Sequence, residues 1–140
     1  MRHRKVMTLA VLCLVLCAPL SLVSCGLGID SDEAKEFISD FFDAVKSEDY
    51  EKAETFLHPD RPADLETNFR TLEEKGNVDF STGITIAQYT GISTVLYDST
   101  VDGSSYTLSL IAIVDGYQIP FTIEIVKNDN GYGIYNLRVN

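Results

Sequence analysis

The chain has 140 residues, of which 11 are Lys or Arg and 21 are Asp or Glu, so its formal net charge is −10. This length suits a single domain with a modest hydrophobic core. The excess of negative charge opposes contact with phosphate backbones and anionic lipid head groups, so nucleic-acid binding is excluded as an expected function.

The first 25 residues have the layout of a secretory signal peptide. A short basic stretch at residues 2–5 precedes an almost wholly apolar run at residues 6–23. Three cysteines lie in or beside this run, but only Cys25 follows a small residue, Ser24. An uncleaved transmembrane helix is the alternative, because about 20 apolar residues can span a bilayer. Pro19 and Ser24 instead indicate a break followed by a processing site.

The sequence Leu22-Val23-Ser24-Cys25 resembles the lipobox of bacterial lipoproteins. The resemblance implies that Cys25 carries a lipid, becomes the N-terminus after cleavage, and anchors the protein on the extracytoplasmic side of the cell membrane. We therefore expect residues 1–24 to be a removable signal peptide and residues 25–29 a short tether. At about 3.5 Å per extended residue, this tether holds a domain at residues 30–140 within roughly 15–20 Å of the bilayer.

Cleavage changes the composition of the mature chain in two ways. Three basic residues leave with the signal, so 8 basic and 21 acidic residues remain, a formal charge of −13. Only one cysteine remains, which excludes a disulfide framework.

Residues 30–76 show a helical period. Apolar residues recur at three- and four-residue spacing between Ala34 and Val45, which predicts an amphipathic helix with one broad apolar stripe. Asp30 or Ser31 is placed to cap its first turn.

Two more helices are expected in this half of the chain. A short one at residues 50–57 follows the capping residue Asp49 and is stopped by Pro59. A third is expected to have Pro62 in its first turn and to end at a left-handed Gly76.

After residue 80 the pattern alternates between apolar and polar positions, which predicts strands. Turn signals at Asp102-Gly103, Asp115-Gly116 and residues 128–131 predict successive hairpins, and therefore an antiparallel meander of four or five strands. Pro120 has no N–H to donate, so we expect it at an edge or a bulge. The expected strands cover residues 84–92, 94–101, 106–114, 117–125 and 132–139.

Apolar residues also fall on the second face of one predicted strand. Ile111 and Ile113 alternate with Leu108 and Leu110, so they lie on the opposite side of the sheet. This side is either covered locally or forms a homodimer surface.

The aromatic helix, the short charged turn Lys46-Ser47-Glu48-Asp49-Tyr50-Glu51-Lys52-Ala53 and the meander resemble the nuclear transport factor 2-like superfamily. The resemblance implies an α+β cone, with N-terminal helices held against a strongly curved antiparallel sheet and a cavity between them. A cystatin-like fold without a cavity is the alternative. For the aromatic side chains, packing in a solid core is the alternative to lining a cavity. The side chains that would line the cavity are Phe37, Phe41, Phe42, Phe69, Tyr106, Leu108, Tyr117 and Phe121.

No catalytic residue carries over from the isomerases and dehydratases of this superfamily, which aim Asp, Tyr or a His/Asp pair into the cavity. Asp40 and Asp43 fall outside the apolar stripe, and His58 has a structural role available at a helix end. An enzyme would need a buried acid or histidine facing a tyrosine, for which His58, Asp98 and Glu124 are the candidates.

We therefore expect a membrane-anchored binding module without catalytic activity, cofactor or metal, whose partner is a small apolar ligand or an envelope protein. The alternatives are an accessory subunit of a membrane-proximal assembly, and an enzyme of the isomerase or dehydratase kind.

Overall fold

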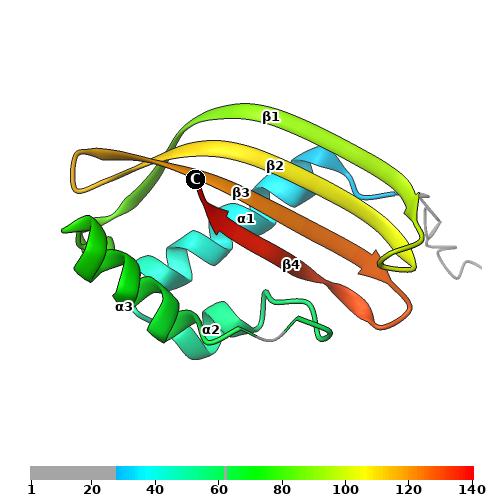
Figure 1. Cartoon of the computed structure of the whole chain (residues 1–140), viewed down its shortest axis with the longest axis horizontal. Helices are drawn as coiled ribbons and strands as arrows, with labels where there is room; N and C mark the ends of the chain where they lie inside the picture. The colour runs from blue at the N-terminus through cyan, green and yellow to red at the C-terminus, as the bar shows by residue number, and fades with distance from the viewer. Residues whose placement is uncertain (1–27, 62) are drawn as a thin grey trace, which may run out of the picture.

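The computed structural model describes residues 28–61 and 63–140, which form an α+β domain with helices packed against one antiparallel sheet (Figure 1). The strands lie side by side in chain order, so the predicted α+β class and the antiparallel meander are confirmed. The elements are α1 (Ser31–Lys46), α2 (Tyr50–Glu54), α3 (Leu65–Gly76), the 3-10 helix η1 (Phe80–Thr82), β1 (Ile84–Asp98), β2 (Gly103–Val114), β3 (Tyr117–Asn128) and β4 (Gly131–Val139).

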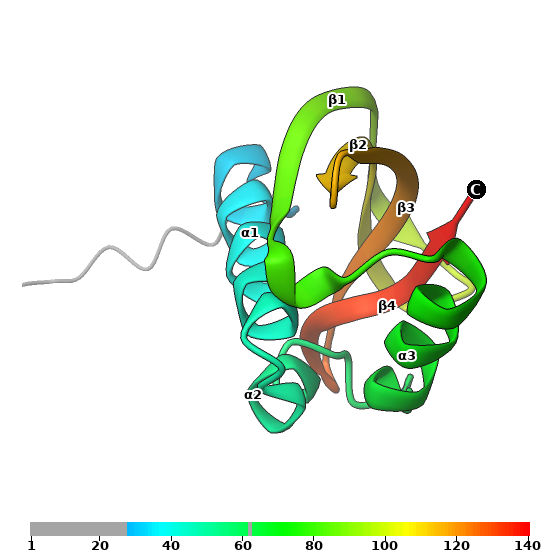
Figure 2. The ribbon, with the colours of Figure 1, turned by 90° about the vertical axis from the view of Figure 1, so that its left-hand side faces the viewer.

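The sheet has four strands, because β1 is continuous where two strands were predicted. β1 pairs with β2 from Ile84 to Asp98, and the pairing register shifts at three places along it. Bulges of this kind bend and twist a strand without ending it. β1 is consequently bent into the arch that Figure 2 shows beside α1, and the break predicted near Ser93 does not occur.

Helix α1 lies along one face of the sheet and supplies much of the core (Figure 2). Asp30 caps it as predicted, since its carboxylate accepts the backbone N–H groups of Asp32 and Glu33 at 2.9 and 3.0 Å. The predicted apolar stripe is buried, because an amphipathic helix gains stability by turning its apolar side chains away from water. Its buried members are Ala34, Ile38, Phe41, Phe42 and Val45, its member Phe37 is partly buried, and the neighbouring Ala44 is buried as well.

Helix α2 is shorter than predicted. Asp49 caps it, since its carboxylate accepts the N–H of Lys52 at 3.0 Å, but the helix ends at Glu54 instead of residue 57. The following residues form a parallel bridge to β4, in which Leu57 faces Ile134. Pairing with the strand satisfies the backbone groups that a longer helix would have used.

Helix α3 begins and ends at residues other than those predicted. Asp64 caps it through the N–H of Thr67 at 2.9 Å, so it starts at Leu65; Pro62 lies outside the described residues. The left-handed residue at its end is Asn77, with φ of 50°, and Gly76 is still helical. Asparagine tolerates this conformation because its short side chain hydrogen-bonds locally.

The expected signal peptide, the lipobox and Cys25 also lie outside the described residues. Within residues 28–61 and 63–140, no helix combines the length and the apolar character needed to cross a membrane.

Candidate functional site: an apolar cleft between α3 and β3

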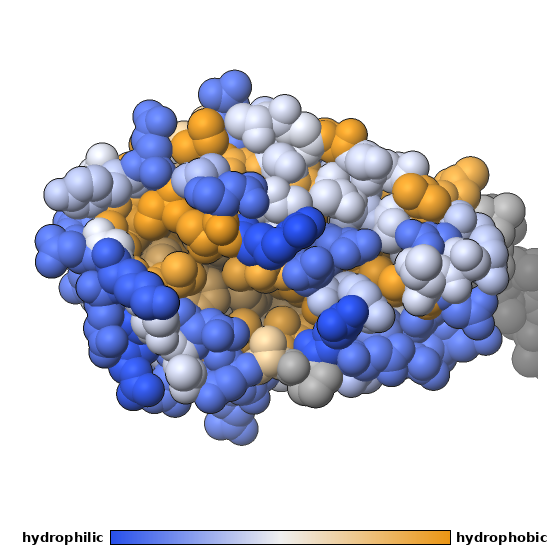
Figure 3. Space-filling model, in the orientation of Figure 1, coloured by the Kyte–Doolittle hydropathy of each residue, from blue (hydrophilic) through white to orange (hydrophobic). Residues whose placement is uncertain are grey.

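A cleft of about 410 Å³ lies between α3 and the first residues of β3. It is visible as the apolar hollow on the left of Figure 3, on the side of the molecule where α3 lies. Its volume falls within the range of about 300–1,000 Å³ that holds small molecules in proteins. The residues that line it are Leu72, Lys75, Gly76, Val78, Phe80, Tyr117, Gln118, Ile119, Pro120 and Val139.

The segment after α3 forms the floor of the cleft. Asn77 turns the chain back, and the N–H of Phe80 donates to the carboxylate of Glu73 at 3.0 Å, which holds η1 against the end of α3. The ring of Phe80 is almost fully buried and meets the ring of Phe69 edge-on, with 5.1 Å between centroids. This T-shaped contact is a favoured aromatic geometry, so the floor is held firmly.

The wall opposite α3 exists because β3 extends beyond β4. The pairing of these strands stops where Phe121 meets Val139, so residues 117–120 have no ladder partner from β4. Pro120 lies in this stretch, where its missing N–H costs no ladder hydrogen bond, and its carbonyl accepts the N–H of Asn140 at 3.0 Å. The predicted edge position of Pro120 is therefore confirmed at this local edge.

Tyr117 and Ile119 supply the apolar surface of this wall. They pair with Val114 and Ala112, whose side chains are buried in the core, so all four face the same side of the sheet. The absence of β4 beside them leaves Tyr117 57% exposed.

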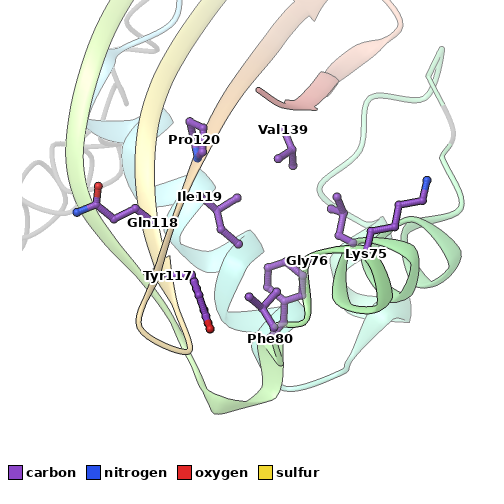
Figure 4. A pocket seen from close by; sticks show the side chains of 10 residues that line it. Lys75, Gly76, Phe80, Tyr117, Gln118, Ile119, Pro120 and Val139 are labelled. Carbon is purple, nitrogen blue, oxygen red and sulfur yellow. The ribbon is translucent and has the colours of Figure 1, made fainter.

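Polar groups lie mainly at the edge of the cleft. Figure 4 shows the Gln118 side chain pointing away from the cleft and the Lys75 ammonium group at its outer side, while Phe80, Tyr117 and Ile119 surround the space. The ionisable side chains among the lining residues are Lys75 and Tyr117. An apolar interior with a polar edge is suited to binding an apolar group by excluding water.

Eight residues were predicted to line a cavity, and Tyr117 is the one among them that lines this cleft. Phe69 lines a smaller hollow of about 220 Å³ between α3 and β4, which is below the usual size of a ligand site. The other six pack in or against the hydrophobic core. Buried there are Phe41, Phe42, Tyr106, Leu108 and Phe121, with Phe37 partly buried.

Apart from Tyr117, sequence reasoning assigned none of the lining residues to a cavity, and it missed Leu72, Val78, Phe80 and Val139 in particular. Residues of a connecting segment and of a strand end have no periodic position from which a cavity could be predicted. The apolar pair flanking Asp79 was the one signal in the sequence that this segment would be buried.

His58 is fully buried, but outside the cleft. Its Nδ1 accepts the N–H of Asp60 at 3.2 Å, so the ring proton is on Nε2, which donates to Asn128 Oδ1 at 3.1 Å. The amide of Asn128 also donates to the carbonyl of Val101 at 2.8 Å. His58 thus joins the loop after α2 to the turns at one end of the sheet, which is a structural role.

The other two candidates for an enzyme also lie outside the cleft. Asp98 accepts hydrogen bonds from the backbone and hydroxyl of Thr100, and these bonds lower the pKa of Asp98. Glu124 is partly buried in β3, where it pairs with Thr107 and Asn136. The lowered pKa of Asp98 is the opposite of what suits a general acid at neutral pH.

One buried hydroxyl group has no hydrogen-bond partner among the described residues, that of Tyr132. Burial raises the pKa of Tyr132 to about 12, and the charges of Glu33 and Asp30 add to this effect. The neighbouring Tyr106 hydroxyl is satisfied by the Ser31 hydroxyl at 3.0 Å.

In the described part of the chain, no group of three or more His, Cys, Asp or Glu side chains is placed to hold a metal ion. On the outer face of the sheet, Ile113 is exposed and Ile111 partly buried, and the homodimer surface stays a prediction. Comparison of the chain with protein-family models, curated proteins and solved structures gave no significant match.

Proposed function

We propose that the protein is a lipoprotein anchored through Cys25 on the extracytoplasmic side of the membrane, and that its domain binds a small apolar ligand in the cleft between α3 and β3. The observation that supports binding is the cleft itself, about 410 Å³ and lined mainly by apolar side chains. An apolar side chain of an envelope protein would satisfy the same surface by the same chemistry.

We further propose that the domain belongs to the nuclear transport factor 2-like class of folds. The N-terminal helices, the meander, and the bulges along the curved β1 support this assignment. So does the position of the cleft between a helix and the sheet, because a cystatin-like fold would leave this interface filled.

The lining of the cleft favours binding over catalysis. General acid–base chemistry needs a positioned group with a suitable pKa within hydrogen-bond reach of the reacting atom. The acids and the histidine considered above lie elsewhere, and Lys75 and Tyr117 come from opposite walls.

Binding is tested with an uncharged apolar fluorophore, N-phenyl-1-naphthylamine, titrated into a domain of residues 28–140. Val139→Phe adds a ring at the mouth of the cleft and should weaken binding by roughly tenfold, about 1.4 kcal/mol. Val95→Phe is the matched control, since both valines are strand residues with 37% and 39% exposure, but Val95 lies on β1 away from the cleft. Equal affinities for the two variants would rule out the cleft as the binding site.

The anchor is tested on the full chain by metabolic labelling with a radioactive fatty acid. Cys25→Ala should abolish labelling and release or mislocalise the protein. Unchanged retention in the membrane fraction would instead support an uncleaved transmembrane helix.

A further inference from the structure

The end of β1 exposes three consecutive hydrophobic residues, Val95, Leu96 and Tyr97, which we call the tip patch. Leu96 and Tyr97 are 66% and 64% exposed, more than any other large hydrophobic residue in the described chain. The strand from Ile84 to Tyr97 has no charged residue, although the chain as a whole is strongly acidic. Exposed edge strands usually bear charges that discourage contacts, so this apolar tip marks an interaction surface.

The path of the chain places the tip patch beside the tether. A Cβ atom added to Gly28 would lie 3.1 Å from Leu96 Cδ2, so the two residues are in contact. Figure 1 shows the first described residues at the end of the domain where β1 turns into β2. Gly28 lies three residues after Cys25 in the chain, a span of at most about 11 Å.

We propose that Leu96 and Tyr97 insert into the interfacial layer of the bilayer that holds the lipid on Cys25. This inference rests on the lipid anchor proposed above, which brings the tip patch to within a few residues' length of the membrane. The chemistry of the two side chains fits this layer. Leucine is apolar, and tyrosine combines an apolar ring with a hydroxyl that remains at the level of the head groups.

The charges around the tip specify the kind of lipid. Asp98 and Asp102 flank the turn between β1 and β2, and the hydroxyl of Tyr97 donates to Asp102 at 2.8 Å. Hydrogen bonds from Thr100 lower the pKa of Asp98, which keeps this carboxylate charged. Two carboxylates beside the tip repel anionic head groups, so the surface suits a zwitterionic lipid.

Insertion of the tip, together with the tether, fixes which end of the domain faces outward. α1 starts beside the tether and its 16 residues rise about 24 Å. The side chain of Lys46, the last residue of α1, comes within 3.8 Å of a Cβ atom added to Gly83. Gly83 directly follows η1, whose Phe80 lines the cleft, so α1 ends near the cleft. In Figure 1 the turn from β1 to β2 lies at one end of the long axis, and α3 and the start of β3, which line the cleft, lie at the other, so the cleft faces away from the bilayer.

The chain contains no tryptophan, so a single introduced tryptophan reports its own surroundings. The lipidated mature protein is reconstituted into phosphatidylcholine vesicles with Leu96→Trp or, as a conservative second reporter, Tyr97→Trp. We expect the emission of both reporters to shift to the blue on reconstitution and to be quenched by lipids brominated near the head group. Tyr117→Trp, in the cleft at the other end of the domain, is the control and should show neither change.

Flotation of the vesicles separates the two proposals. Protein that floats with the vesicles while both tip reporters keep their aqueous emission would overturn insertion but leave the anchor intact. Protein that does not float with the vesicles would refute the proposed lipid anchor, and with it the insertion of the tip patch, which depends on the anchor. A blue shift without vesicles that grows with protein concentration would overturn insertion and show that a second copy covers the tip. Quenching as strong in phosphatidylglycerol as in phosphatidylcholine at low salt would refute the assignment to zwitterionic lipid.

Discussion

Replacing Gly133 with alanine tests whether the loop after α2 is held by direct backbone contact with β4. A Cβ atom at this buried position would lie 2.6 Å from the nitrogen of His58 and 2.7 Å from the carbonyl carbon of Leu57. Carbon atoms in favourable contact are about 3.5–4.0 Å apart, so the loop must move away by about 1 Å. Because the clashing atoms belong to the backbone, no side-chain rotation can relieve the clash.

The movement weakens the contacts that join the loop to the strand. The N–H of His58 donates to the carbonyl of Ile134 at 2.9 Å, and the N–H of Ile134 donates to the carbonyl of Phe56 at 2.8 Å. Each such hydrogen bond contributes about 1 kcal/mol, and overpacking typically costs about 1–3 kcal/mol. Alanine also reduces the conformational entropy of the unfolded chain, which offsets about 0.4–1 kcal/mol of this loss of stability. We therefore expect Gly133→Ala to lower the free energy of unfolding by about 2–3 kcal/mol.

The measurement is equilibrium unfolding in urea, followed by far-ultraviolet circular dichroism. With a slope of about 1–2 kcal/mol per M for a domain of this size, the midpoint should fall by about 1–3 M. Gly91→Ala is the matched control, since Gly91 is also a strand glycine and its added Cβ would lie 3.7 Å from Ser109 Cβ, an ordinary contact. If Gly133→Ala unfolds at the same urea concentration as Gly91→Ala, the tight contact between loop and strand does not exist.

Four other substitutions are expected to change the free energy of unfolding, one of them upward and three downward. Tyr132→Phe should raise the free energy of unfolding by about 1 kcal/mol because it removes a buried hydroxyl without a partner, whereas Tyr106→Phe should lower it by about as much because it loses a hydrogen bond. Since the pKa of Tyr132 is raised from 10.0 to about 12, the native protein should lose stability between pH 10 and pH 12, and Tyr132→Phe should lose less. Asp30→Ala removes the cap of α1 and should cost about 1 kcal/mol. Asn128→Ala should cost about 2–3 kcal/mol because it leaves the buried His58 ring without its acceptor.

These outcomes are measured by thermal and urea unfolding at neutral pH, repeated across the alkaline range for the tyrosine variants. A destabilised Tyr132→Phe would mean that its hydroxyl has a partner. Identical alkaline profiles for this variant and the native protein would show that another group controls the loss of stability. An unchanged melting temperature in Asp30→Ala or Asn128→Ala would contradict the hydrogen bonds described for that residue.

If both proposals hold, the two ends of the domain's long axis would have different roles. The tip of β1 and the tether would contact the membrane at one end, while the cleft would open about 24 Å further out, the length of α1. A ligand would then reach the cleft from the extracytoplasmic space. The short tether would restrict the reach of the cleft to a thin layer outside the bilayer.

The sequence was sufficient for features that depend on near neighbours. The stripe from Ala34 to Val45 defined α1, because helical periodicity places these side chains on one face whatever they pack against. Asp30 and Asp49 identified helix starts by local capping chemistry. The turn signal Asp115-Gly116 defined a two-residue hairpin, in which both residues have the positive φ that such a turn requires, 50° and 80°. Asp102-Gly103 marked the preceding hairpin, but the predicted tight turn was wrong, because Asp98 pairs with Gly103 and the loop covers residues 99–102.

Tertiary structure decided what depends on residues distant in the chain. Helix α2 stops at Glu54 because the next residues pair with β4, about 80 residues later in the chain. β1 continues past Ser93 because β2 pairs with it along its length. The cleft exists because β4 ends at Val139 while β3 extends further, and its floor is a connecting segment folded under α3. No periodic pattern encodes a difference in strand length, so the residues of the candidate site were found only in the folded domain.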